Sequence, residues 1–210
     1  MRVMENIEDK ILDAAITVFL EQGFGATNMK MIAEAAGIGR PSLYYYYKSK
    51  EEIFGKVIGR LMSGLVPKVM GLLSSEASPE EKLDSLVDIY MDQLCSNPKL
   101  PLFLIREANR DMDCLKDGAV ALSLSKYFEG LKSFYDSEVE KGRLRRVPLY
   151  VIMFTLFGSA VIPFLTQPLV EEIFVKGDYD IPGRASSYEE LVNTWRPYVA
   201  DSLKNLLLVR

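Results

Sequence analysis

The sequence predicts an all-α protein of about nine helices, in which a small head of three helices precedes a larger helical bundle. Three observations support this fold class. Apolar residues make up 49% of the 210 residues, which is enough for a substantial core. Helix start and stop signals recur along the chain, whereas no stretch alternates apolar and polar residues as a strand does. The composition also changes near residue 48, where short helices give way to longer, more apolar ones.

The first 47 residues contain signals for three short helices. The segment "IEDKILDAAITVFLEQGF" places its apolar residues on one stripe, and Gly23 stands in the position that glycine favours at a helix end. The segment "TNMKMIAEAAG" predicts a second helix, capped by Thr27 and ended by Gly37. A third helix is expected from Pro41 to Tyr47, because a proline in the first turn lacks only an N–H that would be unpaired anyway.

The helices of the body begin at Ser-x-x-Glu capping boxes, in which two side chains satisfy backbone N–H groups at the helix start. The boxes are Ser49–Glu52, Ser78–Glu81 and Ser187–Glu190. The first of these helices runs toward Pro67, and the last should be kinked or split at Pro197. Further helices are expected at 100–112, 114–141 and 148–166. Residues 167–187 are rich in proline, glycine and serine, and they predict a connecting loop.

The composition excludes several classes of site. The chain has no histidine, which removes the commonest general base, the commonest zinc ligand and any Ser-His or Cys-His pair. Two cysteines, Cys95 and Cys114, cannot form a disulfide framework or a four-ligand metal site, and both are interpreted as small buried hydrophobes. We therefore expect no metal and no cofactor. The polar N-terminus, "MRVMENIEDK", is unlike a secretory signal, so a cytoplasmic protein is expected.

One uncharged stretch, residues 147–170, is long enough to span a bilayer. Three prolines and several polar residues interrupt or bracket it, which disfavours a membrane span. A helix that is apolar on nearly all sides is also expected when it is buried both in its own core and against a partner chain. We favour this second interpretation over a membrane span.

Residues 27 to 50 have the layout of a helix-turn-helix, in which two short helices flank a glycine-containing turn and the second enters the major groove of DNA. Four consecutive tyrosines occupy the second helix, and a helix cannot bury four consecutive residues on one face. Leu43 is expected to point inward, which leaves Tyr44 and Tyr45 to face outward. Tyr47, and part of Tyr46, are expected to pack against the body.

The local charge around this helix is positive although the net charge of the chain is −4. Between Gly37 and Lys50 the charged residues are Arg40, Lys48 and Lys50, with no acid among them. A local cationic patch is what phosphate binding requires, and tyrosine hydroxyls can donate to phosphate oxygens. Arg40 could pair with a guanine in two-pronged fashion or clamp a phosphate.

The pattern from "ILDAAITVFLEQGF" to "GRPSLYYYYKSKEEIF" closely resembles the DNA-binding head of the TetR family of bacterial transcription regulators, over about the first 55 residues. Family members often have histidine where Tyr46 stands, so the role of Tyr46 is less defined than that of its neighbours. The resemblance implies that Thr27 touches phosphate, that the third helix lines the groove and that Lys50 contacts the DNA backbone. The expected DNA-binding residues are Thr27, Asn28, Arg40, Pro41, Ser42, Tyr44, Tyr45, Tyr46, Lys48 and Lys50.

The resemblance further implies a helix-turn-helix DNA-binding domain at 1–48 and a ligand-binding and dimerisation domain at 49–210, with a homodimer formed through the last two helices. Two heads roughly 34–36 Å apart would meet successive major grooves. A small apolar or amphipathic effector entering the body would release the protein from operator DNA. Candidate effector-binding residues are Met91, Phe103, Arg106, Asn109, Tyr127, Phe134 and Phe157, with Met112, Phe128, Met153 and Phe154 as further apolar lining.

Two alternatives concern the body. An enzyme without histidine would need carboxylates or lysines with shifted pKa values, and Glu107 with Asp111 is a candidate pair, although this spacing is more typical of a solvated helix face. A membrane-attached regulator would use residues 147–170. We favour a regulator that is not an enzyme and has no membrane partner. Whether it represses or activates, and which operator, genes and effector it serves, stays open at this point.

Overall fold

The computed structural model describes residues 6–110, 118–178 and 182–209. Within these residues every regular element is a helix, and pairing of extended backbone is confined to one isolated bridge between Leu144 and Leu208. The predicted all-α class is therefore confirmed. The chain forms two compact units: unit 1 comprises residues 1–66 and 102–126, and unit 2 comprises residues 67–101 and 127–210. The division predicted between residues 48 and 49 concerns function, and it stays a prediction.

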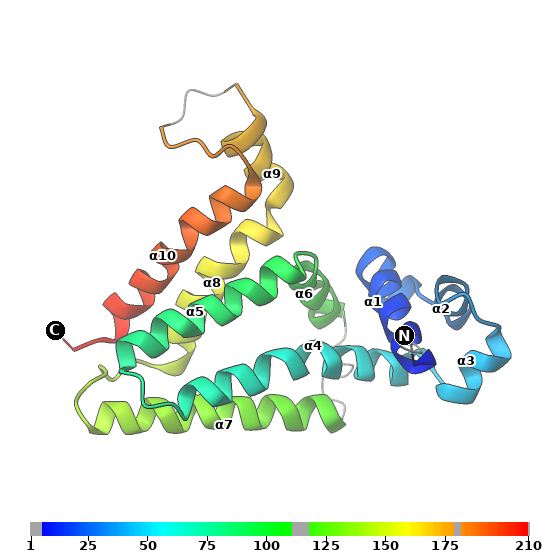
Figure 1. The fold of residues 1–210 in the computed structure, drawn as a ribbon, viewed down its shortest axis with the longest axis horizontal. Helices are drawn as coiled ribbons and strands as arrows, with labels where there is room; N and C mark the ends of the chain where they lie inside the picture. The colour runs from blue at the N-terminus through cyan, green and yellow to red at the C-terminus, as the bar shows by residue number, and fades with distance from the viewer. Residues whose placement is uncertain (1–5, 111–117, 179–181, 210) are drawn as a thin grey trace, which may run out of the picture. The chain divides into compact units, whose positions relative to one another are not determined.

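Unit 1 is built on three helices that follow each other closely (Figure 1). They are α1 (Ile7–Ala26), α2 (Met29–Ala35) and α3 (Arg40–Tyr46). The unit also includes the N-terminal part of α4 (Lys50–Leu73) and most of α6 (Leu100–Arg110). Apolar residues spaced along α1 are buried as the sequence predicts, because a stripe at helical spacing meets the core on every turn.

An aromatic cluster forms the core of unit 1. Phe19 stacks on Phe24, with ring centroids 5.7 Å apart, and meets Phe54 edge-on at 5.5 Å. Phe103 from α6 joins them, 5.7 Å from the Phe54 ring. Burial of rings of this size supplies much of the hydrophobic stabilisation of a small unit. The four rings come from three helices, α1, α4 and α6, so this cluster fixes the frame that carries α2 and α3.

Two expectations for the head need correction. Gly23 has a left-handed backbone (φ 77°) and marks a kink inside α1, which then continues to Ala26. Thr27 does not cap α2, because its hydroxyl donates to the carbonyl of Gly23 at 2.7 Å. Asn28 caps α2 instead, and its side-chain oxygen accepts the N–H of Met31 at 3.1 Å. Both residue types favour helix starts, so the sequence did not separate the two neighbours.

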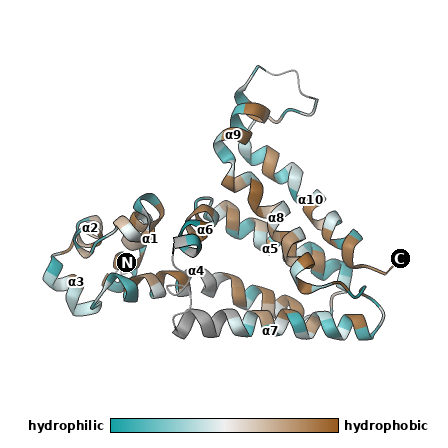
Figure 2. Cartoon of the chain, turned by 180° about the vertical axis from the view of Figure 1, so that it is seen from behind, coloured by the Kyte–Doolittle hydropathy of each residue, from teal (hydrophilic) through white to brown (hydrophobic). Residues whose placement is uncertain are grey.

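Unit 2 is a bundle in which α5 (Pro79–Ser96), α8 (Leu149–Leu165) and α10 (Tyr188–Leu207) lie side by side (Figure 1). It also contains the C-terminal parts of α4 and of α7 (Gly118–Glu140). Ion pairs join α10 to α5: Arg196 lies 2.8 Å from Asp92, and Lys204 lies 2.9 Å from Asp84. In Figure 2, α8 is the most continuously hydrophobic of these helices, as its uncharged sequence predicts.

The body differs from the sequence expectation in several places. Helix α4 does not end near Pro67 but continues to Leu73. Residues expected to be a loop form α9 (Gln167–Glu171) and a short π-helix, η2 (Glu172–Lys176). Helix α10 is not split at Pro197. Packing along these helices outweighs the local cost of an internal proline. Cys95 is exposed rather than buried, and Cys114 lies outside the described residues.

The serine part of each predicted capping box is confirmed at the starts of α4, α5 and α10. The box at Ser78 and Glu81 is complete, with both reciprocal hydrogen bonds present. At the start of α4 the Ser49 hydroxyl accepts the N–H of Glu52, as expected. The Glu52 carboxylate accepts the N–H of Lys48.

Among the described residues no single helix has the length and composition of a membrane span. Helix α8 together with residues 167–176 has them only as a pair of helices bent by 71°.

Candidate nucleic-acid interface and apolar cavity

The tyrosine run divides between solvent and core, as predicted. Tyr44 and Tyr45 are 53% and 84% exposed, whereas Leu43 and Tyr47 are 0% and 5% exposed. Tyr46 is half-buried, and its ring meets that of Tyr45 edge-on at 5.3 Å. Burial raises the pKa of Tyr47 above its ordinary value. Two phenols are thus presented outward from α3, and their neighbours anchor the helix.

The turn before α3 sets its direction. Gly37 adopts a left-handed backbone (φ 62°), which residues other than glycine rarely tolerate. Its N–H donates to the carbonyl of Glu34 at 3.1 Å, and the N–H of Ile38 donates to the carbonyl of Ala33 at 3.0 Å. These two bonds close the end of α2 and allow α3 to begin directly after Gly39. The predicted helix-turn-helix layout is therefore present.

A shallow open hollow lies beside the exposed tyrosines, where the starts of α2, α3 and α4 meet. Its lining consists of Thr27, Asn28, Met29, Lys30, Arg40, Tyr44, Lys48, Ser49, Lys50 and Glu51. Four of these residues are cations and one is an acid, so the hollow has the positive sign that a phosphate backbone requires. It brings together six of the ten predicted DNA-binding residues. Pro41, Ser42 and Tyr45 are exposed on α3 without lining the hollow.

Lys50 has a structural task inside this hollow. Its ammonium donates to the carbonyls of Phe24 and Thr27, each at 2.9 Å, and lies 4.5 Å from the centroid of the Phe24 ring. Thr27 itself is 2% exposed, with its hydroxyl engaged by Gly23. Both residues therefore hold the link between α1 and α2 in place. Their direct contact with phosphate stays a prediction.

A buried carboxylate secures the same link from the other side. Glu107 on α6 was expected on a solvated face, but it is 3% exposed. Its carboxylate accepts the N–H of Phe24 at 3.0 Å, one residue after the kink at Gly23. A buried backbone N–H needs such an acceptor. The role of Glu107 is thus structural within unit 1, and its proposed catalytic partner, Asp111, lies outside the described residues.

An apolar cavity lies within unit 2, between α5, α7, α8 and α10. Its lining consists of Leu83, Leu86, Tyr90, Tyr127, Phe128, Leu131, Phe134, Tyr135, Leu144, Leu149, Ile152, Met153, Leu156, Phe157, Leu203 and Leu207. Three of the seven candidate effector-binding residues belong to this lining: Tyr127, Phe134 and Phe157. The cavity is a concave apolar site with few polar groups, as small-molecule sites usually are.

The other candidates lie elsewhere. Met91 is fully buried in unit 2 but is not part of the lining. Phe103 belongs to the aromatic core of unit 1, and Arg106 and Asn109 lie on the same helix. Phe128 and Met153 do line the cavity, whereas Phe154 is 74% exposed and Met112 lies outside the described residues. Effector contact by any of these residues stays a prediction.

Sequence reasoning missed Tyr90, which is the most informative lining residue. Its hydroxyl is 2.9 Å from the hydroxyl of Tyr127, across the space between α5 and α7. Burial raises the pKa of Tyr90 well above its ordinary value, and burial also raises that of Tyr127. Both phenols are therefore neutral. The signal was available, because Leu83, Leu86 and Tyr90 recur at helical spacing on one face of α5.

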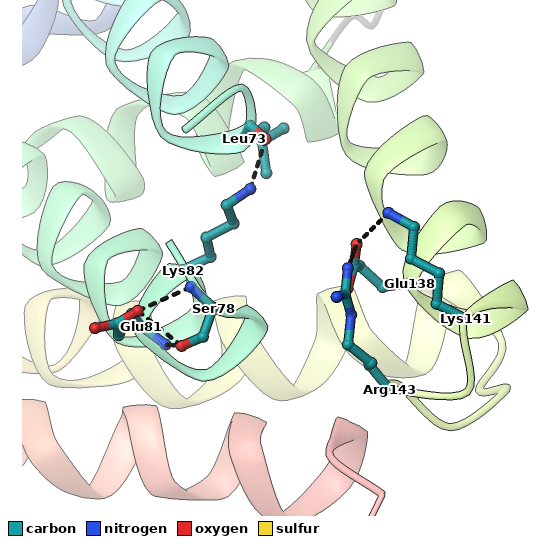
Figure 3. Close-up of polar contacts among 7 residues, drawn as sticks. All are labelled: Leu73, Ser78, Glu81, Lys82, Glu138, Lys141 and Arg143. Carbon is teal, nitrogen blue, oxygen red and sulfur yellow. Dashed lines mark hydrogen bonds and ion pairs between the residues drawn. The ribbon is translucent and has the colours of Figure 1, made fainter. Parts of the chain in front are cut away.

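Two buried charged side chains of unit 2, Lys82 and Glu138, are paired with other groups (Figure 3). Lys82 is 8% exposed; its ammonium donates to the carbonyl of Leu73 at 2.8 Å and lies 5.2 Å from the centroid of the Phe134 ring. At the end of α7, the Glu138 carboxylate accepts from Arg143 at 2.7 Å and from Lys141 at 3.1 Å. The hydrogen bond from Arg143 is the main cause that lowers the pKa of Glu138.

Within the described part of the chain, no three His, Cys, Asp or Glu side chains are grouped so as to hold a metal ion. The candidate functional features are thus α3, with one cation and two exposed phenols, in unit 1 and an apolar cavity with a hydroxyl pair in unit 2.

Comparison with known proteins relates the N-terminal part of the chain to one family. Residues 11–57 match the family described as "bacterial regulatory proteins, tetR family". A curated relative, the HTH-type transcriptional repressor KstR2 of Mycolicibacterium smegmatis, is 31% identical over 130 residues, which cover 52% of this chain and 63% of that protein. The aligned part thus spans less than two thirds of that relative's length.

Solved structures extend the likeness of the fold to nearly the whole chain. The fatty acid degradation regulator FadR from Bacillus halodurans superposes with a TM-score of 0.67 at 22% identity, covering 97% of this chain and 99% of that one. FadR from Bacillus subtilis, in complex with stearoyl-CoA, gives a TM-score of 0.67 at 18% identity, covering 92% of this chain and 97% of the other. At these identities the likeness establishes the fold alone.

Proposed function

We propose that this chain, which belongs to the tetR family of bacterial regulatory proteins, is a ligand-responsive repressor that binds operator DNA through α3 and leaves it when a small molecule occupies unit 2. The observation that carries the DNA-binding part is the outward display of Tyr44 and Tyr45 beside Arg40 and Lys48. Phenol hydroxyls and guanidinium groups contact phosphates and base edges, and α3 is anchored by the buried Leu43.

The proposed assembly is a homodimer through α8 and α10. These helices expose large apolar side chains, namely Tyr150, Phe154, Ile162, Trp195 and Tyr198. Tyr150, Phe154 and Ile162 recur at multiples of four residues, so they form one stripe along α8. Exposed apolar patches of this kind commonly mark protein–protein interfaces. A dimer would present two heads, and two heads roughly 34–36 Å apart reach successive major grooves.

The proposed control is a population shift. An effector can change the DNA-competent fraction only if it binds the competent and incompetent states with different affinity. The apolar cavity of unit 2 supports an apolar or amphipathic effector. Among the relatives, FadR from Bacillus subtilis was solved with stearoyl-CoA, which makes an acyl chain the first candidate for this cavity. Repression rather than activation is proposed because the relative KstR2 is a repressor.

The remaining parts of the proposal follow from the same assignment. Residues 1–48 serve DNA binding and residues 49–210 serve ligand binding and dimerisation. We propose a cytoplasmic protein without enzymatic activity and without a membrane partner. Absence of turnover by purified protein, and recovery of a dimer without detergent, are the expected observations.

The test of DNA binding uses fluorescence anisotropy with labelled duplexes at several salt concentrations. Affinity should fall steeply with salt, because cationic side chains displace counterions from phosphates. Lys48→Ala should weaken binding to all duplexes alike and reduce the salt slope by about 1. Lys56→Ala, which removes an exposed lysine outside the hollow, is the matched control. Binding that is independent of salt, or equal loss in both variants, would count against the proposal.

A further inference from the structure

We propose that the hydroxyl pair of Tyr90 and Tyr127 is the polar anchor of the cavity, and that the cavity takes a neutral lipophilic molecule carrying one acceptor oxygen, such as an ester or ketone carbonyl. This inference rests on the proposed function, because it specifies the effector of the same cavity. It also specifies which part of an acyl compound is recognised, namely an uncharged carbonyl rather than a free carboxylate.

The two hydroxyl groups together have one O–H donor that the bond between them does not use. Two neutral phenols carry two O–H donors, and the 2.9 Å bond between them uses one. Whichever hydroxyl donates to the other, one donor is left, and no acceptor for it is recorded among the described residues. Tyr90 and Tyr127 are 8% and 4% exposed, so bulk water satisfies this donor poorly. A buried donor without a partner costs free energy, which a ligand oxygen would recover.

The third tyrosine of the lining is already engaged. The Tyr135 hydroxyl accepts the N–H of Val147 at 2.5 Å and lies 2.7 Å from the carbonyl of the same residue. This tyrosine therefore ties α7 to the segment before α8. Among the tyrosines that line the cavity, Tyr90 and Tyr127 can therefore donate a hydrogen bond to a polar group of a ligand.

The charge distribution argues for a neutral ligand. None of the sixteen lining residues carries a formal charge. The nearest buried cation, Lys82, is not part of the lining; its ammonium is bonded to the carbonyl of Leu73 and lies over the Phe134 ring. A carboxylate in this cavity would lose its hydration without gaining a counter-ion. An ester or ketone of similar shape accepts one hydrogen bond and needs no counter-ion.

The rest of the lining favours an apolar body. Leu, Ile, Met and Phe side chains form all of it apart from the three tyrosines. A hydrocarbon would gain the same burial as an ester but would leave the spare donor of the tyrosine pair unsatisfied. The expected discrimination is therefore moderate, about five- to tenfold in affinity, which is the usual worth of one hydrogen bond.

The test compares three probes that share a chain: methyl octanoate, octanoate and octane. Their binding to the full-length protein is measured by calorimetry and by the shift in melting temperature. Methyl octanoate should bind more tightly than the other two. The double variant Tyr90→Phe/Tyr127→Phe removes both O–H donors, so it should weaken methyl octanoate binding by about five- to tenfold and leave octane binding unchanged. Each single variant keeps one O–H donor for the ligand, so it should lose less affinity than the double variant. Tyr135→Phe is the matched control, because it removes a lining hydroxyl that is engaged elsewhere, so it should not reduce the preference for the ester over octane.

Several results would overturn this inference. They are equal or tighter binding of octanoate, no binding by any probe, or an ester preference that survives in the double variant Tyr90→Phe/Tyr127→Phe. DNA binding by the ligand-free protein is measured in the same samples, together with circular dichroism to check the fold. If the ligand-free wild type does not bind DNA, the proposed function is wrong. If it binds DNA but shows no preference for the ester, only the assignment of Tyr90 and Tyr127 as the polar anchor is wrong.

Discussion

In unit 1, Tyr44 and Tyr45 project into solvent from a seven-residue helix, whereas in unit 2 Tyr90 and Tyr127 are buried and bonded to each other. The exposed phenols lie beside Arg40 and Lys48, so they suit a large anionic partner. The buried phenols face an uncharged lining, so they suit a small neutral one. The surroundings of each tyrosine, rather than the residue type, thus determine which kind of partner its hydroxyl suits.

The largest change in DNA affinity is predicted for replacement of the exposed tyrosines of α3. Replacing both Tyr44 and Tyr45 by alanine should lower affinity for the preferred duplex by about a hundredfold, because base and phosphate contacts contribute roughly 1–3 kcal/mol each. Anisotropy titration measures the loss. Tyr90→Phe, at a buried tyrosine, is the control and should leave ligand-free DNA affinity unchanged. Similar losses in both proteins would show that the two kinds of tyrosine do not have separate roles.

The next prediction concerns the stripe on α8 that we assign to a dimer. Phe154→Glu places a charge where the ring is 74% exposed, so the monomer fold should tolerate it while the dimer should dissociate. Sedimentation velocity reports the mass, and DNA affinity should fall with it. Phe174→Glu, at another exposed phenylalanine outside α8 and α10, is the matched control. A wild-type monomer, or a Phe154→Glu dimer, would contradict the assignment.

A smaller effect is expected from the carboxylate that secures the frame of the head. Glu107→Ala removes the acceptor of the Phe24 N–H and should destabilise the protein by about 1–3 kcal/mol. Chemical denaturation monitored by circular dichroism measures the change. Glu107→Gln keeps an acceptor oxygen and should recover part of the loss. Equal stability of the alanine variant and the wild type would exclude this role for Glu107.

The smallest effect is a pH dependence in unit 2. The Glu138 carboxyl has a folded-state pKa below its ordinary value, mainly because Arg143 donates to it. Its stabilising contribution is thus full above the unfolded pKa of 4.5 and is lost as the pH falls through the folded pKa. The free energy of unfolding should decline less steeply below about pH 4.5 in Glu138→Gln than in the wild type. Parallel declines would mean that other carboxyl groups dominate.

The head could be predicted from the sequence because its signals are local. Gly37, Leu43 and the tyrosine run lie within eleven residues, and helical spacing alone assigns Leu43 and Tyr47 to the core and Tyr44 and Tyr45 to solvent. The prediction that Thr27 caps α2 was wrong, because threonine and asparagine both favour that position. The Thr27 hydroxyl instead donates to the carbonyl of Gly23 at the kink, and Asn28 caps the helix.

The cavity could be predicted only in part, because its walls come from segments far apart in the sequence. Aromatic residues at helical spacing identify a buried face but not the neighbour it faces. Phe103 and Phe134 were therefore assigned to one pocket, although Phe103 packs against Phe19 and Phe54 in unit 1. Likewise, the loop expected after α8 contains α9 and η2. Pro168 stands in the first turn of α9 and Gly177 follows η2, and both positions are compatible with a helix.

Selection of binding sites from a pool of random duplexes tests whether α3 recognises a DNA sequence. The wild type should enrich a sequence made of two related half-sites about one helical turn apart. The Arg40→Ala and Tyr44→Ala variants should lose that preference at particular base pairs, while Tyr127→Phe keeps it. Failure of the wild type to enrich any sequence, or an identical preference in the α3 variants, would contradict the account.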